Sequence, residues 1–436
     1  MSSTTTSGYL TIRFSDVEVA PADLIACRSC DLLQTLPTLR AGEAARCVRC
    51  KHLLTEIHHE SLERAFALAA SGLLLLILSA SYPFLGVSAE GQMVQMTLFD
   101  SAVSLFRYQE PLLASLVFAF VFLFPTILLV LQLVLLTLLL MGRISWLTPW
   151  LTRAVLQLAA WNMVEVFMLG VLVSIAKLSS LATVQIGLSF WCFVGFVLCT
   201  LATQATLDPY QLWRTVERRR FGANRSAPSS VPVESGVGLL GCHRCGKILS
   251  AQHKRCPVCF SRRKQRLPNS LQATAALLVT AIVLYLPANL LPIMSTTEFG
   301  VVIRSTIAGG IVLLWQDGSY PTAIVIFVAS LLVPIVKIIL LCWLCWSVYD
   351  GHSRGTSQRS FVYRVTEFIG RWSMVDVFVV ALLVALFQFG TVLSVEPGGA
   401  ALAFCGVVIA TMLAARAFDP RLIWDARVNA KEATTS

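Results

Sequence analysis

Charged residues are scarce in this chain. Asp, Glu, Lys and Arg make up only 13% of its 436 residues, whereas hydrophobic residues make up 56%, and the mean hydropathy is +0.73. A soluble domain usually contains about 25% charged residues, and a disordered chain needs low hydrophobicity. The composition therefore argues against both an ordinary soluble protein and a disordered one.

Signals for several common activities are also absent. Residues 1–26 are polar and lack the apolar stretch of a secretory signal peptide, so we expect no cleaved leader. No Gly-x-x-x-x-Gly-Lys-Ser/Thr motif occurs, which argues against a nucleotide-binding P-loop. No nucleophile paired with a base stands out either, and we expect a protein that is not an enzyme.

Long apolar stretches are what the sequence does contain. Three of them, 112–142, 178–207 and 267–297, hold no charged residue at all, and each exceeds the roughly 20 residues that a spanning helix needs. Backbone groups in lipid must bond internally, so each span is expected to be helical. The prediction is an all-α polytopic membrane protein with spans at 65–86, 112–142, 156–178, 184–206, 271–293, 320–349, 371–393 and 398–417.

The basic residues predict the orientation of these spans. Thirty of the 34 Lys and Arg residues fall on one side of the eight-span topology. Since Lys and Arg favour the cytoplasmic side, both termini are expected in the cytoplasm. The net charge of +10 is therefore attributed to membrane topology, and no nucleic-acid partner is expected.

The two halves of the chain repeat each other. Trp-Asn-Met-Val-Glu-Val-Phe at 161–167 recurs as Trp-Ser-Met-Val-Asp-Val-Phe at 372–378, and Asp208-Pro209 recurs as Asp419-Pro420, both 211 positions later. Each half has an even number of expected spans, so both halves should insert in the same orientation as a parallel repeat.

Each half also opens with two Cys-x-x-Cys pairs, which together place eight of the 13 cysteines: Cys27, Cys30, Cys47, Cys50, Cys242, Cys245, Cys256 and Cys259. Four thiolates can close a tetrahedron around zinc and leave no open position for catalysis. Disulfides are disfavoured in the cytoplasm, and iron in a rubredoxin-like site is the main competitor. We expect two structural zinc ions, because so small a module needs its metal to fold, and a positive φ at Gly246.

These signals predict the organisation of the whole chain. In order, we expect a disordered N-terminus (1–23), a zinc ribbon (24–60), a four-helix transmembrane repeat (61–213), a flexible linker (214–239), a second zinc ribbon (240–266), a second four-helix repeat (267–427) and a C-terminal tail (428–436).

Charged residues inside spans need a reason, because each costs about 2.5–3.5 kcal/mol at the centre of a helix. Lys177, near the outer end of the third span, either reaches the headgroups or marks a polar site. Lys337 lies well inside the sixth span, where an interior polar site is expected, and its repeat counterpart is Leu128. Glu165 and Asp376 occupy matching positions near cytoplasmic ends, where pairing with basic residues is the alternative to a functional role.

Prolines should shape several spans. Asn289 lies between Pro287 and Pro292 and is expected to bridge the backbone groups that they leave free. Pro125 and Pro334 should kink the second and sixth spans, which at about 30 residues are too long for the bilayer unless they tilt or protrude.

Two outer loops, 87–111 and 294–319, are the longest segments expected outside the cytoplasm. Each contains an apolar-periodic stretch. Interfacial helices or short strands are the simpler prediction, and a docking platform for an extracytoplasmic partner is the alternative.

The combination of a double Cys-x-x-Cys module and four spans in each half resembles the paraquat-inducible protein A family of Gram-negative inner-membrane proteins, over about 24–427. The segments 287–293, 333–337 and 369–378 carry the resemblance most closely. It implies traffic of phospholipid or another hydrophobic molecule between the two membranes, through a partner with MCE domains that forms a periplasmic tunnel, in support of outer-membrane integrity.

The resemblance also marks polar positions that are expected to matter in transport, namely Lys177, Ser330, Lys337 and Asp376. Two other functions remain open from the residues alone. One is a proton-coupled secondary transporter of small solutes, which would also use repeats and intramembrane charge. The other is a membrane-tethered zinc or redox sensor.

Overall fold

The computed structural model describes the chain from residue 24 to residue 425, with internal gaps. The gaps are 38, 41, 59, 90–91, 101–102, 104–105, 107–110, 179–182, 223–239, 250–253, 263–265, 299–300, 317, 319, 351–354, 373, 376–377, 380–381 and 383–392. The expected disordered N-terminus, most of the linker and the C-terminal tail lie outside the described residues.

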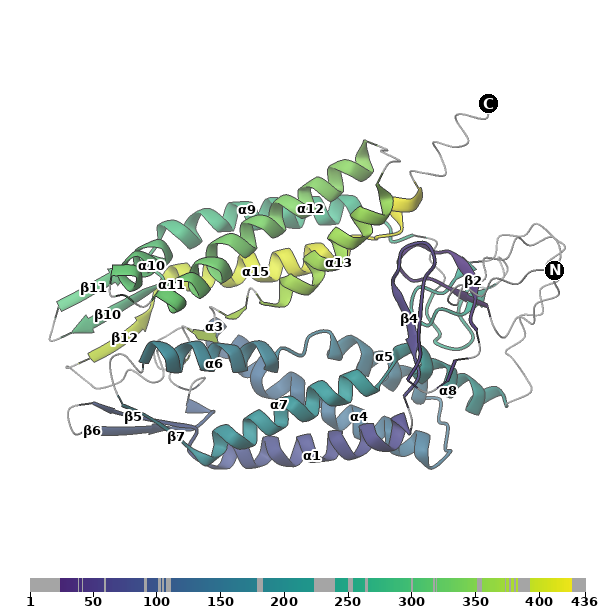
Figure 1. Cartoon of the computed structure of the whole chain (residues 1–436), viewed down its shortest axis with the longest axis horizontal. Coiled ribbons are helices and arrows are strands. Elements are labelled where there is room, and N and C mark those ends of the chain that lie inside the picture. Colours follow the sequence, from purple (N-terminus) through teal and green to yellow (C-terminus); the bar gives the residue numbers. More distant parts are fainter. Residues whose placement is uncertain are drawn as a thin grey trace, which may run out of the picture.

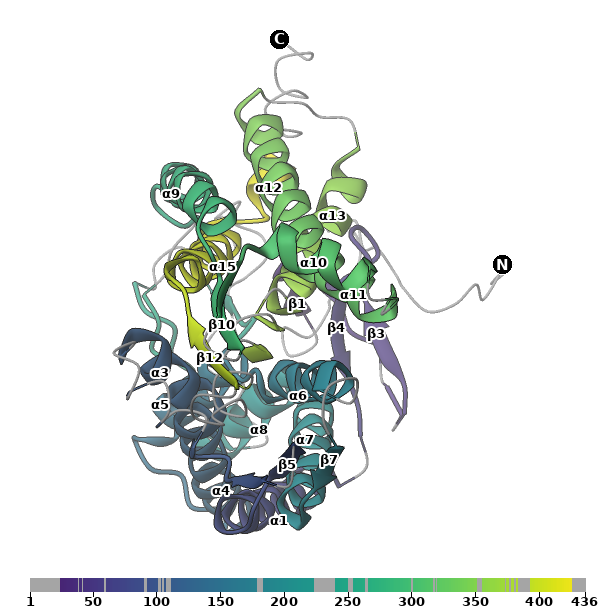
Figure 2. The same ribbon diagram turned by 90° about the vertical axis from the view of Figure 1, so that its left-hand side faces the viewer.

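Helices form two groups that lie side by side, one for each half of the sequence (Figures 1 and 2). The helices of the first half are α1 (Ser61–Ser81), α3 (Pro111–Phe118), α4 (Phe124–Leu140), α5 (Thr148–Ala159), α6 (Val164–Leu178), α7 (Leu188–Thr206) and α8 (Pro209–Phe221). Those of the second half are α9 (Ser270–Leu290), α10 (Ile307–Gln316), α11 (Tyr320–Ile326), α12 (Val333–Tyr349), α13 (Thr356–Trp372) and α15 (Gly399–Ala417).

Seven helical stretches of the described residues are long and apolar enough to cross a membrane, four in the first half and three in the second. They are Ser61–Ser81, Ala114–Leu140, Thr148–Ile175, Leu188–Thr206, Ser270–Leu290, Ala323–Tyr349 and Gly399–Ala417. The chain is thus a mostly helical, multi-pass membrane protein. The remaining expected span, 371–393, falls largely outside the described residues.

The first and last spans of each half pack together in the same way. Leu75 of α1 touches Gly195 of α7, where an added Cβ would lie 3.1 Å from the leucine side chain. Leu284 of α9 touches Gly406 of α15 in the matching place, at 2.9 Å. Each glycine therefore lets its helix approach its partner closely, and the same contact recurs in both halves.

The long second and sixth spans each change helical register beside their proline. A π-helical turn precedes each proline-containing helix, η2 (Ala119–Leu123) before α4 and η3 (Phe327–Leu332) before α12. The N–H of Phe124 reaches back five residues to the carbonyl of Ala119, and that of Val333 does the same to Val328. Each of the two prolines, Pro125 and Pro334, thus directly follows a π-turn, an irregularity at which helices can kink.

Two small antiparallel sheets lie at one end of the molecule (Figure 1, left). The first has the order β6 (Gln92–Met96), β5 (Leu85–Ala89), β7 (Thr183–Ile186), and the second has the order β11 (Val301–Ser305), β10 (Met294–Glu298), β12 (Leu393–Pro397). In each, a hairpin follows the first span and a third strand precedes the last span. Short strands in the outer loops are thus confirmed, and α10 supplies a helix beside the second sheet.

The repeated tryptophan motif joins the two halves. Phe167 and its counterpart Phe378 pack edge to face with ring centroids 5.4 Å apart. Gly170 lies against the same contact, since a Cβ there would be 3.1 Å from the Cβ of Phe378. Met163 and Met374, also equivalent in the repeat, are fully buried in the same core.

Candidate metal centres and a buried polar site

Each four-cysteine cluster is built from two tight turns. The first cysteine module (residues 24–60) carries strands β1 (Leu24–Ala26), β2 (Leu33–Thr35), β3 (Ala44–Arg46) and β4 (Leu53–Glu56), and the second (residues 240–266) carries β8 (Leu240–Gly241) and β9 (Ile248–Leu249). In every turn, the residue after the second cysteine has a positive φ: Asp31 60°, Lys51 59°, Gly246 76° and Phe260 55°. The prediction for Gly246 is confirmed, and its N–H donates to the carbonyl of Cys242 at 2.9 Å.

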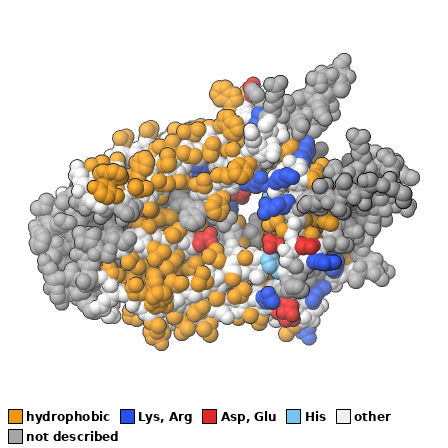
Figure 3. Space-filling model, in the orientation of Figure 1, with side chains coloured by type: hydrophobic (Ala, Val, Ile, Leu, Met, Phe, Trp, Pro, Cys, Tyr) orange, Lys and Arg blue, Asp and Glu red, His pale blue; other side chains and the backbone are white. Residues whose placement is uncertain are grey.

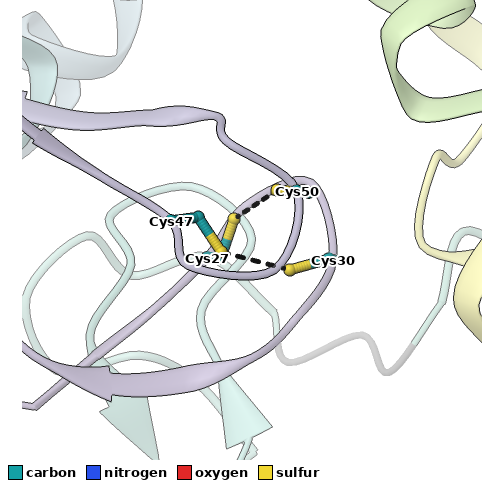
Figure 4. Close-up of side chains that lie close together, drawn as sticks. All are labelled: Cys27, Cys30, Cys47 and Cys50. Carbon is teal, nitrogen blue, oxygen red and sulfur yellow. Dashed lines mark hydrogen bonds between the residues drawn. The ribbon is translucent and has the colours of Figure 1, made fainter. Parts of the chain in front are cut away.

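The turns bring four sulfur atoms together in each module. In the first, Cys27 and Cys50 are 3.5 Å apart and Cys30 and Cys47 are 3.6 Å apart, measured between their Sγ atoms (Figure 4). In the second module the corresponding two distances are both 3.5 Å. All eight cysteines are buried, and within each module the sulfur atoms lie within 4.8 Å of one another. A metal bonded to four thiolates at about 2.3 Å places them roughly 3.8 Å apart, so both groups can bind a metal ion.

Hydrogen bonds among the four thiols of the first module shift their pKa values in opposite directions. Hydrogen bonds from Cys27 and Cys30 lower the pKa of Cys47 strongly and contribute to lowering that of Cys50 to about 7. The hydrogen bond with Cys27 raises the pKa of Cys30. The close approach of the four sulfur atoms therefore favours the deprotonated form of Cys47 and Cys50. Deprotonated sulfur is what a metal requires, so the cluster is suited to exchanging its remaining protons for a divalent cation.

The first cysteine module rests on the second half of the chain. The guanidinium of Arg49 lies over the ring of Trp424, 4.4 Å from its centroid. Arg421 donates from Nε to the carbonyl of Arg28 at 3.3 Å. The four cysteines belong to the same apolar cluster as Trp424 and Phe418, at the end of the last span.

Arg266 reinforces this contact. Its guanidinium donates to Asp31 of the first module at 2.9 Å and to Asp425 of the C-terminal segment at 2.6 Å. The hydrogen bond with Asp425 is the largest cause of its raised pKa. Its repeat counterpart, 209 positions earlier, is Ile57, so the first half has no equivalent of this bridge.

The second cysteine module packs against the first half, just as the first module packs against the second half. Its cysteines share an apolar cluster with Trp213, the repeat counterpart of Trp424. Arg220 of α8 lies over the ring of Phe260 at 4.5 Å, and Glu217 pairs with Lys247. The cysteine clusters are therefore crossed, since each packs against the tryptophan of the other half, while Thr55 of the first module also bonds to Asp208 of its own half.

The modules also touch each other. A Cβ at Gly241 would fall 2.2 Å from the Cβ of Ala26, so β8 passes β1 at a distance that only glycine allows. Figure 3 shows that Lys and Arg side chains gather at the module end, whereas hydrophobic side chains cover the helical body.

The repeated Asp-Pro motif anchors each half to the start of its first span. Asp208 accepts hydrogen bonds from the hydroxyl of Thr55 at 2.5 Å and from the N–H of Glu56 at 2.7 Å, and it caps α8. Asp419 accepts the N–H of Leu267 at 3.2 Å. The motif therefore joins both ends of each helical group.

Two buried polar side chains lie in the sixth span, one on η3 and one on α12. Lys337 is 2% exposed and Ser330 is 1% exposed, and their separation of seven residues places them near one face of the helix. Neither the Nζ of Lys337 nor the Oγ of Ser330 has a hydrogen-bond partner among the described residues. Their counterparts in the first half, Leu128 and Val121, are apolar and fully buried.

Of the other predicted polar residues, the structure describes the side chains of Glu165 and Asn289. Glu165 lies in the first turn of α6, where the helix dipole favours a carboxylate. The Nδ2 of Asn289 donates to the carbonyl of Tyr285 at 2.8 Å, on its own helix. The side chain of Lys177 and the whole of Asp376 lie outside the described residues.

Arg416 makes a contact between the two halves that the sequence did not predict. It donates to the carbonyl of Ala160 at 2.6 Å and lies 4.3 Å from the ring centroid of Trp161. This joins the end of α15 to the break between α5 and α6. Its one sequence signal was a basic residue at the end of the last span.

Known proteins resemble the chain along most of its length. The model of the family described as "Paraquat-inducible protein A" matches twice, at residues 62–217 and 271–427. "Intermembrane transport protein PqiA" of Escherichia coli (strain K12) is 40% identical over 92% of this chain and 95% of its own.

More distant relatives cover the chain equally well. "Lipophilic envelope-spanning tunnel protein A" of Escherichia coli (strain K12) is 31% identical over 96% of this chain and 95% of its own. "Probable intermembrane transport protein" of Haemophilus influenzae is 30% identical over 93% and 96%. No solved structure matches the chain.

Proposed function

Because the chain belongs to the paraquat-inducible protein A family, we propose that it is the membrane component of an intermembrane transport system that moves lipids across the cell envelope. The relatives' names describe intermembrane transport and an envelope-spanning tunnel. A transport role also agrees with a chain in which the sequence offers no catalytic arrangement.

The protein sits in the inner membrane with both termini and both cysteine modules in the cytoplasm. The bias of 30 basic residues to one side supports this orientation. The two small sheets and α10 then face the periplasm, at the opposite end of the molecule from the modules (Figure 1).

Each cysteine module holds one zinc ion through its four cysteines, and each behaves as a zinc ribbon. Zinc supplies folding free energy to a module too small to fold without it. Burial of all eight thiols, together with the seating of each module against helices, supports this structural role rather than redox sensing. By joining the halves crosswise, the modules hold the helical groups together on the cytoplasmic side.

The buried Lys337 and Ser330 are the observation that carries the proposed transport site. Unpartnered polar groups inside a membrane helix are costly and are kept where they serve a ligand or ion path. Ser330 lies within the π-turn η3 and Lys337 lies in the helix that follows it, and such irregularities are frequent at functional sites. We therefore place the path of the cargo at Ser330 and Lys337 of the second half. Further candidates to line it are Asn289 and Asp376 of the same half and Glu165 and Lys177 of the first half.

The partner is a periplasmic protein with MCE domains that receives or delivers phospholipid at the sheet end. The test is to cross-link growing cells, purify the protein and identify what accompanies it. We expect an MCE-domain protein and phospholipid. Proton flux driven by a small solute in liposomes that contain this chain alone would instead support a secondary transporter and overturn the proposal.

A further inference from the structure

Gly370 lies against the end of the Lys337 side chain. A Cβ at Gly370 would fall 2.7 Å from the Nζ and 3.0 Å from the Cε of Lys337. Real Cβ atoms essentially never approach a neighbour so closely, so the ammonium group occupies space that only a glycine leaves open. The two residues come from adjacent helices, α12 and α13.

A glycine in this place has a cost that needs a reason. Within a helix, glycine is less favourable than alanine, because its backbone loses more conformational freedom on folding. Gly370 lies within α13, and its φ is not among the positive values of the chain. Backbone conformation therefore does not require glycine here, whereas the neighbouring ammonium does.

The first half provides a natural comparison. The counterparts of Lys337 and Gly370 are Leu128 and Ala159, which belong to one apolar cluster between α4 and α5. The same helix pair thus contains leucine opposite alanine in one half and lysine opposite glycine in the other. The lysine and the missing methyl group occur together.

We propose that Gly370 is a positioning residue that makes room for the buried ammonium of Lys337 and so sets where that charge meets the cargo. This inference rests on the proposed function of Lys337. The atom that an added methyl group would displace is the tip of a flexible side chain, so the fold should accept Gly370→Ala while the charge moves.

The experiment compares four variants in cells that lack their own copy, with detergent resistance and membrane protein level as readouts. They are Gly370→Ala, Lys337→Leu, the double variant that recreates the first-half pair, and the matched control Ala159→Gly. The thermal midpoint of each purified protein is the third readout, because a merely structural role for Gly370 would lower it.

We expect Gly370→Ala to lose most of the resistance that Lys337→Leu loses, with its protein level and thermal midpoint unchanged or raised. Ala159→Gly should retain resistance, and the double variant should be as stable as the wild type and no worse in function than Lys337→Leu. Full resistance in Gly370→Ala while Lys337→Leu fails would overturn this inference alone. Full resistance in Lys337→Leu would overturn the proposed transport role of the lysine, and the inference about Gly370 would fall with it.

Discussion

The two halves of the membrane region share their backbone and differ in what they bury. Both have a π-turn before a proline-containing helix, a leucine against a glycine between the first and last spans, and a three-stranded sheet at the same end of the molecule. At equivalent positions, however, the first half has the apolar Val121 and Leu128 where the second half has Ser330 and Lys337. Duplication has kept the geometry, whereas the pair of Ser330 and Lys337 occurs only in the second half.

The cysteine modules differ from each other much less. Both bury four thiols in the same kind of turn, and each is packed on the other half through equivalent tryptophans, Trp213 and Trp424. The shared parts are therefore the ones that assemble the two halves. The parts that differ are the ones we assign to transport.

Loss of a metal site should have the largest effect, because structural zinc contributes about 10–16 kcal/mol in small modules. Wild-type protein should contain two zinc ions per chain, one for each four-cysteine group. Cys47→Ser and Cys256→Ser should each lose one ion and lower the amount of protein in the membrane. Metal analysis of the purified proteins measures this, and iron in place of zinc would refute the assignment of the metal.

The polar site should show the sharpest difference between the halves. Lys337→Leu should abolish detergent resistance at an unchanged protein level, since it removes an unpartnered buried charge and leaves an apolar residue of the kind found in the first half. Leu128→Met, a volume-conserving change at the equivalent position, should retain resistance. Equal loss in both variants would mean that the halves are not specialised in this way.

The Arg266 bridge should contribute a moderate amount of stability. Arg266→Gln removes charge-assisted hydrogen bonds to Asp31 and Asp425, which we expect to lower the free energy of unfolding by about 1–2 kcal/mol, given their partial exposure. Thermal unfolding of the purified protein measures it, with Arg262→Gln as the exposed control. If the two variants unfold alike, the bridge does not hold the modules.

The ring pair between the halves should give the smallest effect. A double-mutant cycle with Phe167→Leu and Phe378→Leu isolates the contact of the two rings. Edge-to-face pairs couple by about 0.5–1.5 kcal/mol. Strictly additive losses of stability in the cycle would show that the two rings have no coupling energy and that their contact adds nothing beyond the burial of each ring.

Much of this architecture could be predicted because its signals are local. Apolar length located the spans, such as 184–206 where the structure has Leu188–Thr206. The third span was expected from residue 156, yet the helix begins at Thr148. The reason is that α5 is amphipathic, with polar Thr148 and Thr152 buried and Arg153 interrupting its hydropathy.

The parts that escaped prediction depend on distant residues. Strand β12 pairs with β10 about a hundred residues earlier, and the sequence of neither strand indicates which strand it pairs with. Cysteine spacing predicted both clusters, but the crossed seating depends on contacts such as Arg49 with Trp424. Likewise, Lys337 was visible as an intramembrane charge, whereas the role of Gly370 became apparent only when the two helices were placed together.

The most direct test asks which half touches lipid. A photo-crosslinking amino acid is placed at Ser330 or at its equally buried counterpart Val121, and lipid adducts are identified by mass spectrometry after irradiation of living cells. The account predicts a phospholipid adduct at position 330 and none at position 121. Adducts of equal yield at both positions, or at position 121 alone, would contradict it.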